Sequence, residues 1–128
     1  MRVVTTLQPI ILYNGGAALN YDTAPGSGTT GTVTLSETAA NFKEITIFYR
    51  TNDNTYDSIT VPSPNGKAAS LMSVSVNSSA AWFKARLIDL SGTTISTHGG
   101  TNYLEISLPA GTVTNTNFIY IVRVEGIR

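Results

Sequence analysis

One face of the longest predicted strand combines an aromatic ring with two cations. Trp82, Lys84 and Arg86 alternate along residues 80–90, so an extended chain directs all three to the same side. An aromatic ring beside polar groups suits saccharide binding, and it equally suits a subunit interface or a half-buried position. We predict Trp82, Lys84 and Arg86 as ligand-binding residues and place the opposite face, which carries Phe83, in the core.

Groups that could perform catalysis are scarce. His98 is the single histidine and stands in a His-Gly-Gly turn, without the nucleophile motif of a catalytic triad. Glycoside hydrolysis needs two carboxylates that face each other across a cleft. The chain has only eight acidic residues, and most lie at turns or on predicted outer faces. We predict no catalytic residue and a protein that is not an enzyme; a small polysaccharide depolymerase is the least favoured alternative.

The segment 53–57 is the best candidate for a metal site. It places oxygen ligands at alternate positions, as calcium loops do, but it lacks their central glycine and distal glutamate. A turn closed by an aspartate side chain is the simpler interpretation. Thiolate zinc sites are excluded because the chain has no cysteine. We predict no metal and no cofactor, and a calcium site would be sought first at Asp53 and Asp57.

Composition indicates one β-rich domain over residues 1–128. Hydrophobic residues make up 41% of the chain and charged residues only 12%, while threonine, serine, asparagine and glycine favour strands and turns. The formal net charge of zero argues against a nucleic-acid partner. No apolar run is long enough to span a membrane, and the first residues do not have the pattern of a signal peptide.

Short apolar segments separated by turn residues predict the fold class. No segment of crossover-helix length lies between them, so an antiparallel arrangement is expected. We predict an all-β, jelly-roll-like antiparallel β-sandwich of about eight to nine strands, in which residues 1–30 form an N-terminal strand and a Gly/Ser-rich loop. The predicted strands cover residues 7–13, 31–36, 44–50, 55–61, 71–76, 80–90, 93–97, 103–108 and 118–125.

Alternation along these segments predicts the core, because alternate residues of a strand share one face. The residues predicted to be buried are Val33, Leu35, Ile45, Ile47, Tyr49, Val74, Val76, Phe83, Leu87, Leu104, Ile106, Leu108, Tyr120 and Val122.

The last predicted strand is apolar on both faces. Ile119 and Ile121 lie opposite the face that carries Tyr120 and Val122. A strand covered on both sides is either central in one subunit or covered by a second subunit. We predict Ile119 and Ile121 as interface residues of a homo-oligomer, to which Trp82 also contributes.

Three segments, distributed in order along most of the chain, carry a resemblance to a known class of protein. Residues 31–50 read GTVTLSETAANFKEITIFYR, residues 12–16 read LYNGG, and residues 118–128 read FIYIVRVEGIR. They resemble parts of C-terminal β modules in tail fibre and minor tail proteins of phages and prophages of Gram-positive bacteria. Residues 12–16 resemble the opening element of such modules, residues 31–50 a recurrent internal stretch, and residues 118–128 the closing strand. The tryptophan often found in the opening element is absent here.

The resemblance implies a virion tail module with a structural or host-attachment role that binds a cell-surface polysaccharide. Such modules are often trimeric, so the resemblance leads us to predict a homotrimer. It transfers no catalytic residue to this chain. The residues alone would equally allow a dimer. The alternative is a monomeric carbohydrate-binding module of a secreted bacterial protein, with an exposed aromatic platform.

Overall fold

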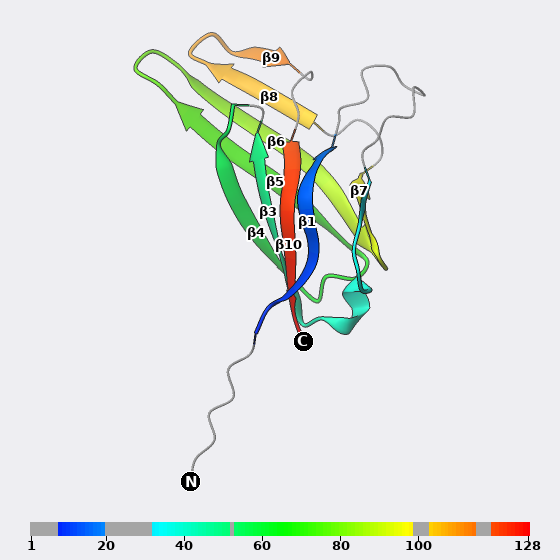
Figure 1. Ribbon diagram of the computed structural model, residues 1–128. Helices are drawn as coiled ribbons and strands as arrows, with labels where there is room; N and C mark the ends of the chain where they lie inside the picture. The colour runs from blue at the N-terminus through cyan, green and yellow to red at the C-terminus, as the bar shows by residue number, and fades with distance from the viewer. Residues whose placement is uncertain (1–7, 20–31, 52, 99–102, 115–118) are drawn as a thin grey trace.

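The structure is a computed structural model, and two antiparallel sheets pack face to face in it (Figure 1). The residues that the structure describes are 8–19, 32–51, 53–98, 103–114 and 119–128. For residues 16–19, 103–105 and 113–114 it describes the main chain alone.

The first sheet has four strands in the order β1-β10-β3-β4. The strands are β1 (Ile10–Leu19), β10 (Ile119–Ile127), β3 (Glu44–Thr51) and β4 (Tyr56–Pro62). The first and last of the described strands are therefore neighbours, and β10 lies in the middle of the sheet between β1 and β3.

The second sheet has six strands and is organised around β6 (Ala81–Ser91). One edge of β6 pairs along its length with β5 (Lys67–Val76). The other edge pairs first with β8 and then with β7. The remaining strands of this sheet are β7 (Thr94–Thr97), β8 (Tyr103–Leu108), β9 (Thr112–Thr114) and β2 (Val33–Thr34).

The predicted all-β antiparallel sandwich is confirmed. The described residues contain one short 3₁₀ turn, η1 (Ala39–Asn41), and no helix long and apolar enough to span a membrane. The described strands number ten, and the one without a counterpart in the prediction is β9, which forms a hairpin with β8.

The core lies between the two sheets and consists mainly of aliphatic side chains. In β3 the burial alternates strictly, so Ile45, Ile47, Tyr49 and Thr51 all point inward. The largest of the fully buried side chains are Val33, Ile45, Ile47, Thr51, Leu71, Ile88, Leu90, Ile95, Ile119, Ile121 and Val124.

The prediction that Ile119 and Ile121 form an interface is wrong. Both side chains are fully buried within the subunit, because β10 is a central strand whose inner face lies in the core. A register shift between Ile121 and Arg123 then changes the alternation, so Val124 returns to the inner face and Val122 is left half-buried. Tyr120 is also half-buried rather than a core residue.

The predicted faces of β5 and β6 are also reversed. Val74, Val76 and Phe83 are exposed on the outer face of the second sheet, as is Leu108 of β8. The pairing of β5 with β6 has no register shift, so the alternation of β6 is uninterrupted. Because Ile88 and Leu90 face the core, Lys84 and Arg86 face it too, and Phe83 lies on the outer face. The aliphatic residues at one end of β6 therefore decide the orientation of the whole strand.

The remaining core predictions divide as follows. The burial of Val33, Leu35, Ile45, Ile47 and Tyr49 is confirmed. Leu87 and Ile106 are half-buried on the outer face, and the side chain of Leu104 is outside the described residues.

Candidate functional site

The cations predicted to lie on a free surface are inside the sandwich. Lys84 and Arg86 have exposed fractions of 6% and 3%, and they share the inner face of β6 with Ile88 and Leu90. A charged group is rarely buried to this extent unless it is paired. This end of the interior is therefore polar, whereas the opposite end is aliphatic.

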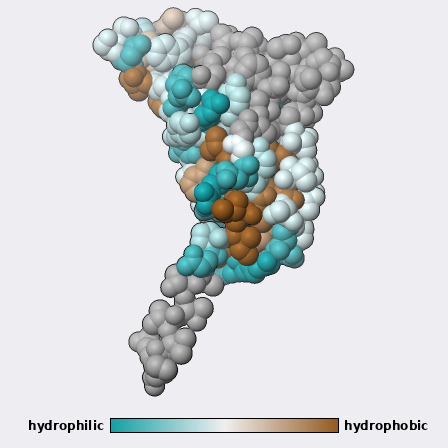
Figure 2. All heavy atoms as spheres, in the orientation of Figure 1, coloured by the Kyte–Doolittle hydropathy of each residue, from teal (hydrophilic) through white to brown (hydrophobic). Residues whose placement is uncertain are grey.

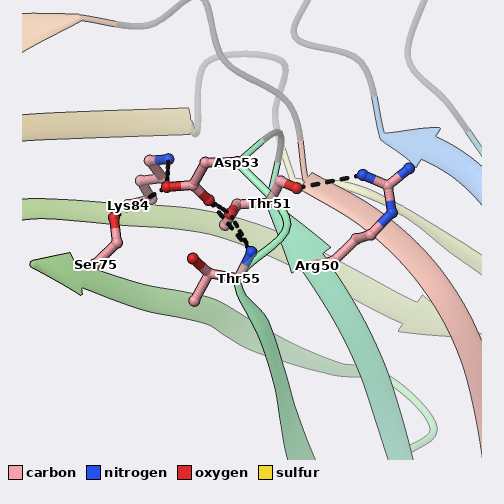
Figure 3. Close-up of polar contacts among 6 residues, drawn as sticks. All are labelled: Arg50, Thr51, Asp53, Thr55, Ser75 and Lys84. Carbon is pink, nitrogen blue, oxygen red and sulfur yellow. Dashed lines mark hydrogen bonds and ion pairs between the residues drawn. The ribbon is translucent and has the colours of Figure 1, made fainter.

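One partner of Lys84 comes from the turn between two strands of the other sheet. Asp53 lies in the turn between β3 and β4, and its Oδ2 atom is 2.9 Å from Nζ of Lys84 (Figure 3). The same oxygen accepts a hydrogen bond of 3.0 Å from the hydroxyl of Ser75 on β5. One carboxylate oxygen thus connects the turn of the first sheet to two strands of the second.

The other oxygen of Asp53 closes its own turn. Oδ1 accepts hydrogen bonds from the hydroxyl of Thr51 and, at 3.3 Å, from the main-chain N–H of Thr55. Asn54 occupies the turn with a positive φ of 64°, a conformation that asparagine tolerates. The aspartate-closed turn expected for this segment is confirmed.

Asp53 is held in its ionised form. Burial raises the pKa of its carboxyl, but the hydrogen bonds from Thr51, Lys84, Thr55 and Ser75 outweigh burial and hold the pKa well below its usual range. A carboxylate whose two oxygens both accept hydrogen bonds in this way holds the turn and the strands of the second sheet together. It is poorly suited to act as a general acid near neutral pH.

Trp82 lies where this polar interior opens to solvent. The strands β5 and β6 continue past the contacts with Asp53 to their connecting turn, and Figure 1 shows this hairpin extending beyond the end of the first sheet. Trp82 shares the inner face with Lys84, and it is half-buried. Its direct cross-strand partners are Ser75 on β5 and Ser107 on β8, both half-exposed.

We call Trp82, Ser75, Ser107 and Asp53 the aromatic edge. It combines a ring, two hydroxyls and a fixed carboxylate next to a buried ammonium group. Ser107 also donates a hydrogen bond of 3.3 Å to the carbonyl oxygen of Thr112. Such a set can stack against an apolar surface of a ligand and hydrogen-bond its hydroxyl groups.

The other predicted site residues lie elsewhere. His98 and Asp89 form a pair on the outer face, with Nδ1 of His98 2.7 Å from Oδ1 of Asp89, and no described hydroxyl hydrogen-bonds this imidazole. Asp57 accepts a hydrogen bond of 2.8 Å from the N–H of Ser58. Among the described residues no three histidine or acidic side chains cluster in a way that could hold a metal ion.

A separate pocket of about 320 Å³ lies at the opposite end of the sandwich, between η1 and the segment after β4. None of its lining residues is ionisable, so it offers no acid or base. They are Ala39, Ala40, Phe42, Ser63, Pro64 and Asn65.

The sequence identified Trp82, Lys84 and Arg86 but not their partners. Thr51 continues the inward alternation of β3, and Ser75 lies opposite Trp82 on the neighbouring strand. The alternation of the strands could therefore have predicted that both face the interior. What the pattern does not contain is the position of Asp53, because it depends on a turn that reaches across from the other sheet. No protein-family model matches the chain, and no curated protein is significantly similar to it.

Proposed function

We propose that this chain is a non-catalytic attachment module of a phage or prophage tail that binds a cell-surface saccharide at the aromatic edge. The observation that carries the proposal is the row formed by Ser75, Trp82 and Ser107 beside the fixed carboxylate of Asp53. A half-buried tryptophan offers part of its ring to a pyranose face, while the flanking hydroxyls and the carboxylate can pair with sugar hydroxyls.

The braced carboxylate supports binding rather than turnover. Asp53 is fixed by Lys84 and Ser75 before any ligand arrives, so a sugar hydroxyl would meet an acceptor that loses little freedom on binding. Retaining or inverting hydrolysis would require a second carboxyl group on the other side of the sugar, at about 5–9.5 Å. Several identical weak sites on one assembled tail would bind the same cell surface together, so the overall affinity would exceed that of a single site.

The chain contains a single tryptophan, so its fluorescence reports on this site alone. We expect soluble oligosaccharides from cell-wall polysaccharide of Gram-positive bacteria to shift or quench the emission of Trp82 in a saturable manner. Trp82→Ala should weaken binding about tenfold or more in calorimetry, whereas Trp82→Phe should retain most of it.

Phe83→Ala is the matched control, because it removes a ring from the next residue on the opposite face. It should leave oligosaccharide binding unchanged. The proposal fails if a broad panel of such saccharides leaves the emission unchanged, or if Trp82→Ala binds as well as the native chain.

The second candidate is a monomeric carbohydrate-binding module of a secreted bacterial protein, which the same site would serve. The molar mass in solution separates the two: a single copy of 13.6 kDa at all concentrations would favour this alternative.

A further inference from the structure

The outer face of the second sheet is apolar over three adjacent strands. Cross-strand pairing joins Val74 to Phe83 and Phe83 to Ile106, and it joins Ala81 to Leu108 in the next row. We call this surface the outer apolar face. Its most exposed members are Met72, Val74, Val76, Phe83 and Leu108, with exposed fractions of 57%, 49%, 72%, 43% and 40%.

No charged residue interrupts the described part of these rows. The nearest ionisable pair on the same face, Asp89 and His98, lies toward the other end of β6, four residues beyond Ala85. By contrast, the exposed large hydrophobic residues described in the first sheet are Ile11 and Tyr56. The face shown in Figure 2 mixes hydrophobic patches, the clearest over β1 and β10 near the C-terminus, with hydrophilic residues. The two outer faces of the sandwich are therefore unequal, and a sheet with one solvated face normally alternates apolar with polar residues.

We propose that a second copy of this chain covers the outer apolar face, so that two second sheets pack against each other around a two-fold axis. Two neutral apolar faces are mutually complementary without any charged partner, and the chain as a whole carries no net charge that would oppose pairing. Sheets of this kind pack about 10 Å apart with interdigitating side chains.

The exposed area fits a pair of this kind. If a fully exposed side chain of this size offers about 180 Å², the five residues present about 450 Å² of apolar surface, or about 900 Å² in a pair. The core of a homodimer interface is about 65% apolar, so the total would be near 1,400 Å², within the range of specific interfaces. This interface uses the residues that the subunit's own core leaves out, not the buried Ile119 and Ile121.

Light scattering coupled to size-exclusion chromatography tests the proposal on the whole chain. We expect a species of twice 13.6 kDa that dissociates on dilution between about 100 and 1 µM. Val74→Glu and Phe83→Glu should each weaken the pairing at least about 30-fold, because a carboxylate would be buried without a partner. Both side chains are partly solvated in one copy, so the variants should fold, which circular dichroism and thermal melting would verify.

Ile11→Glu is the matched control, since Ile11 is 48% exposed on the other sheet. It should leave the mass unchanged. A 13.6 kDa species at every concentration, a mass of three copies, or a pair that survives in Val74→Glu and Phe83→Glu would each overturn the proposal. Binding of oligosaccharide by Phe83→Glu, followed through Trp82, keeps this test separate from that of the proposed function.

Discussion

The hydroxyl of Tyr49 hydrogen-bonds both main-chain polar groups of Met72. It donates to the carbonyl oxygen and accepts from the N–H at 3.0 Å, and so connects β3 of the first sheet to β5 of the second. Among the described strands β5 pairs only with β6, so every second residue of β5 directs its main-chain groups away from the sheet. Tyr49 satisfies one of these residues at the edge.

Tyr49→Phe should therefore lower the free energy of unfolding by about 1–2 kcal/mol without changing the fold. The loss reflects two main-chain groups of Met72 left without their partner in a partly buried position. Urea denaturation followed by circular dichroism would measure it. Tyr56→Phe, which alters a tyrosine that is 65% exposed, should change stability by less than about 0.5 kcal/mol. Equal stability of Tyr49→Phe and the native chain would contradict the role assigned to this hydroxyl.

Asp53 should make stability depend on acid. Its folded pKa lies below the usual aspartate value of about 3.9, because four donors outweigh the effect of burial. The stabilisation is therefore complete above that usual value and is lost as the pH falls below it toward the folded pKa. Thermal unfolding of the native chain should show this loss.

Asp53→Asn isolates that contribution. The Asp53 side chain is 39% exposed, so solvent screens the ion pair with Lys84 and the variant should lose only about 1–2 kcal/mol at pH 7. The difference in the free energy of unfolding between the native chain and Asp53→Asn should become smaller as the pH falls below about 4. A difference that stays constant across this range would show that the carboxylate charge has no part in it.

Removing the hydroxyl from each of two buried residues near this site should change stability differently. Thr51 donates to Asp53, whereas the hydroxyl of Ser73 is buried without a hydrogen-bond partner among the described residues. Thr51→Ala should destabilise the chain by about 1–2 kcal/mol, and Ser73→Ala should be neutral or stabilising by up to about 1 kcal/mol. Paired thermal melts give the comparison directly. A marked loss in Ser73→Ala would mean that this hydroxyl has a partner in solution.

Alternation predicted the strands well and their inward faces only in part. In β3 one side carries Ile45, Ile47 and Tyr49, whereas Phe48 is the single apolar residue of the other side, so the pattern favoured one orientation. In β6 the apolar residues change sides along the strand, from Phe83 at one end to Ile88 and Leu90 at the other. A local pattern of this kind does not show which end lies beneath the other sheet.

The candidate site was incompletely predictable for a related reason. Asp53 helps to make the burial of Lys84 tolerable from a turn 31 positions earlier in the chain, and only the packing of the two sheets brings them together. Similarly, the register shift after Ile121 reverses the alternation of β10 in a segment that reads as an uninterrupted strand.

Gly126 provides the last prediction, because a side chain cannot be added there without displacing Phe42. A Cβ atom at Gly126 would lie 2.5 Å from Cδ1 of Phe42, whose ring is itself buried and has the Arg128 guanidinium 5.2 Å from its centre. Gly126 pairs with Ile10 and Ile45 on its two sides, so β10 cannot easily shift away. Gly126→Ala should therefore cost about 1–3 kcal/mol of stability by overpacking.

The matched test is a double-mutant cycle with Phe42→Leu, which shortens the side chain that meets the new methyl group. Phe42→Leu alone should destabilise the chain, since it removes buried apolar volume. Combined with Gly126→Ala, it should cost less than the two separate losses together, with a coupling of about 1 kcal/mol. Strictly additive losses in urea denaturation would show that the cost of Gly126→Ala does not arise from contact with this ring.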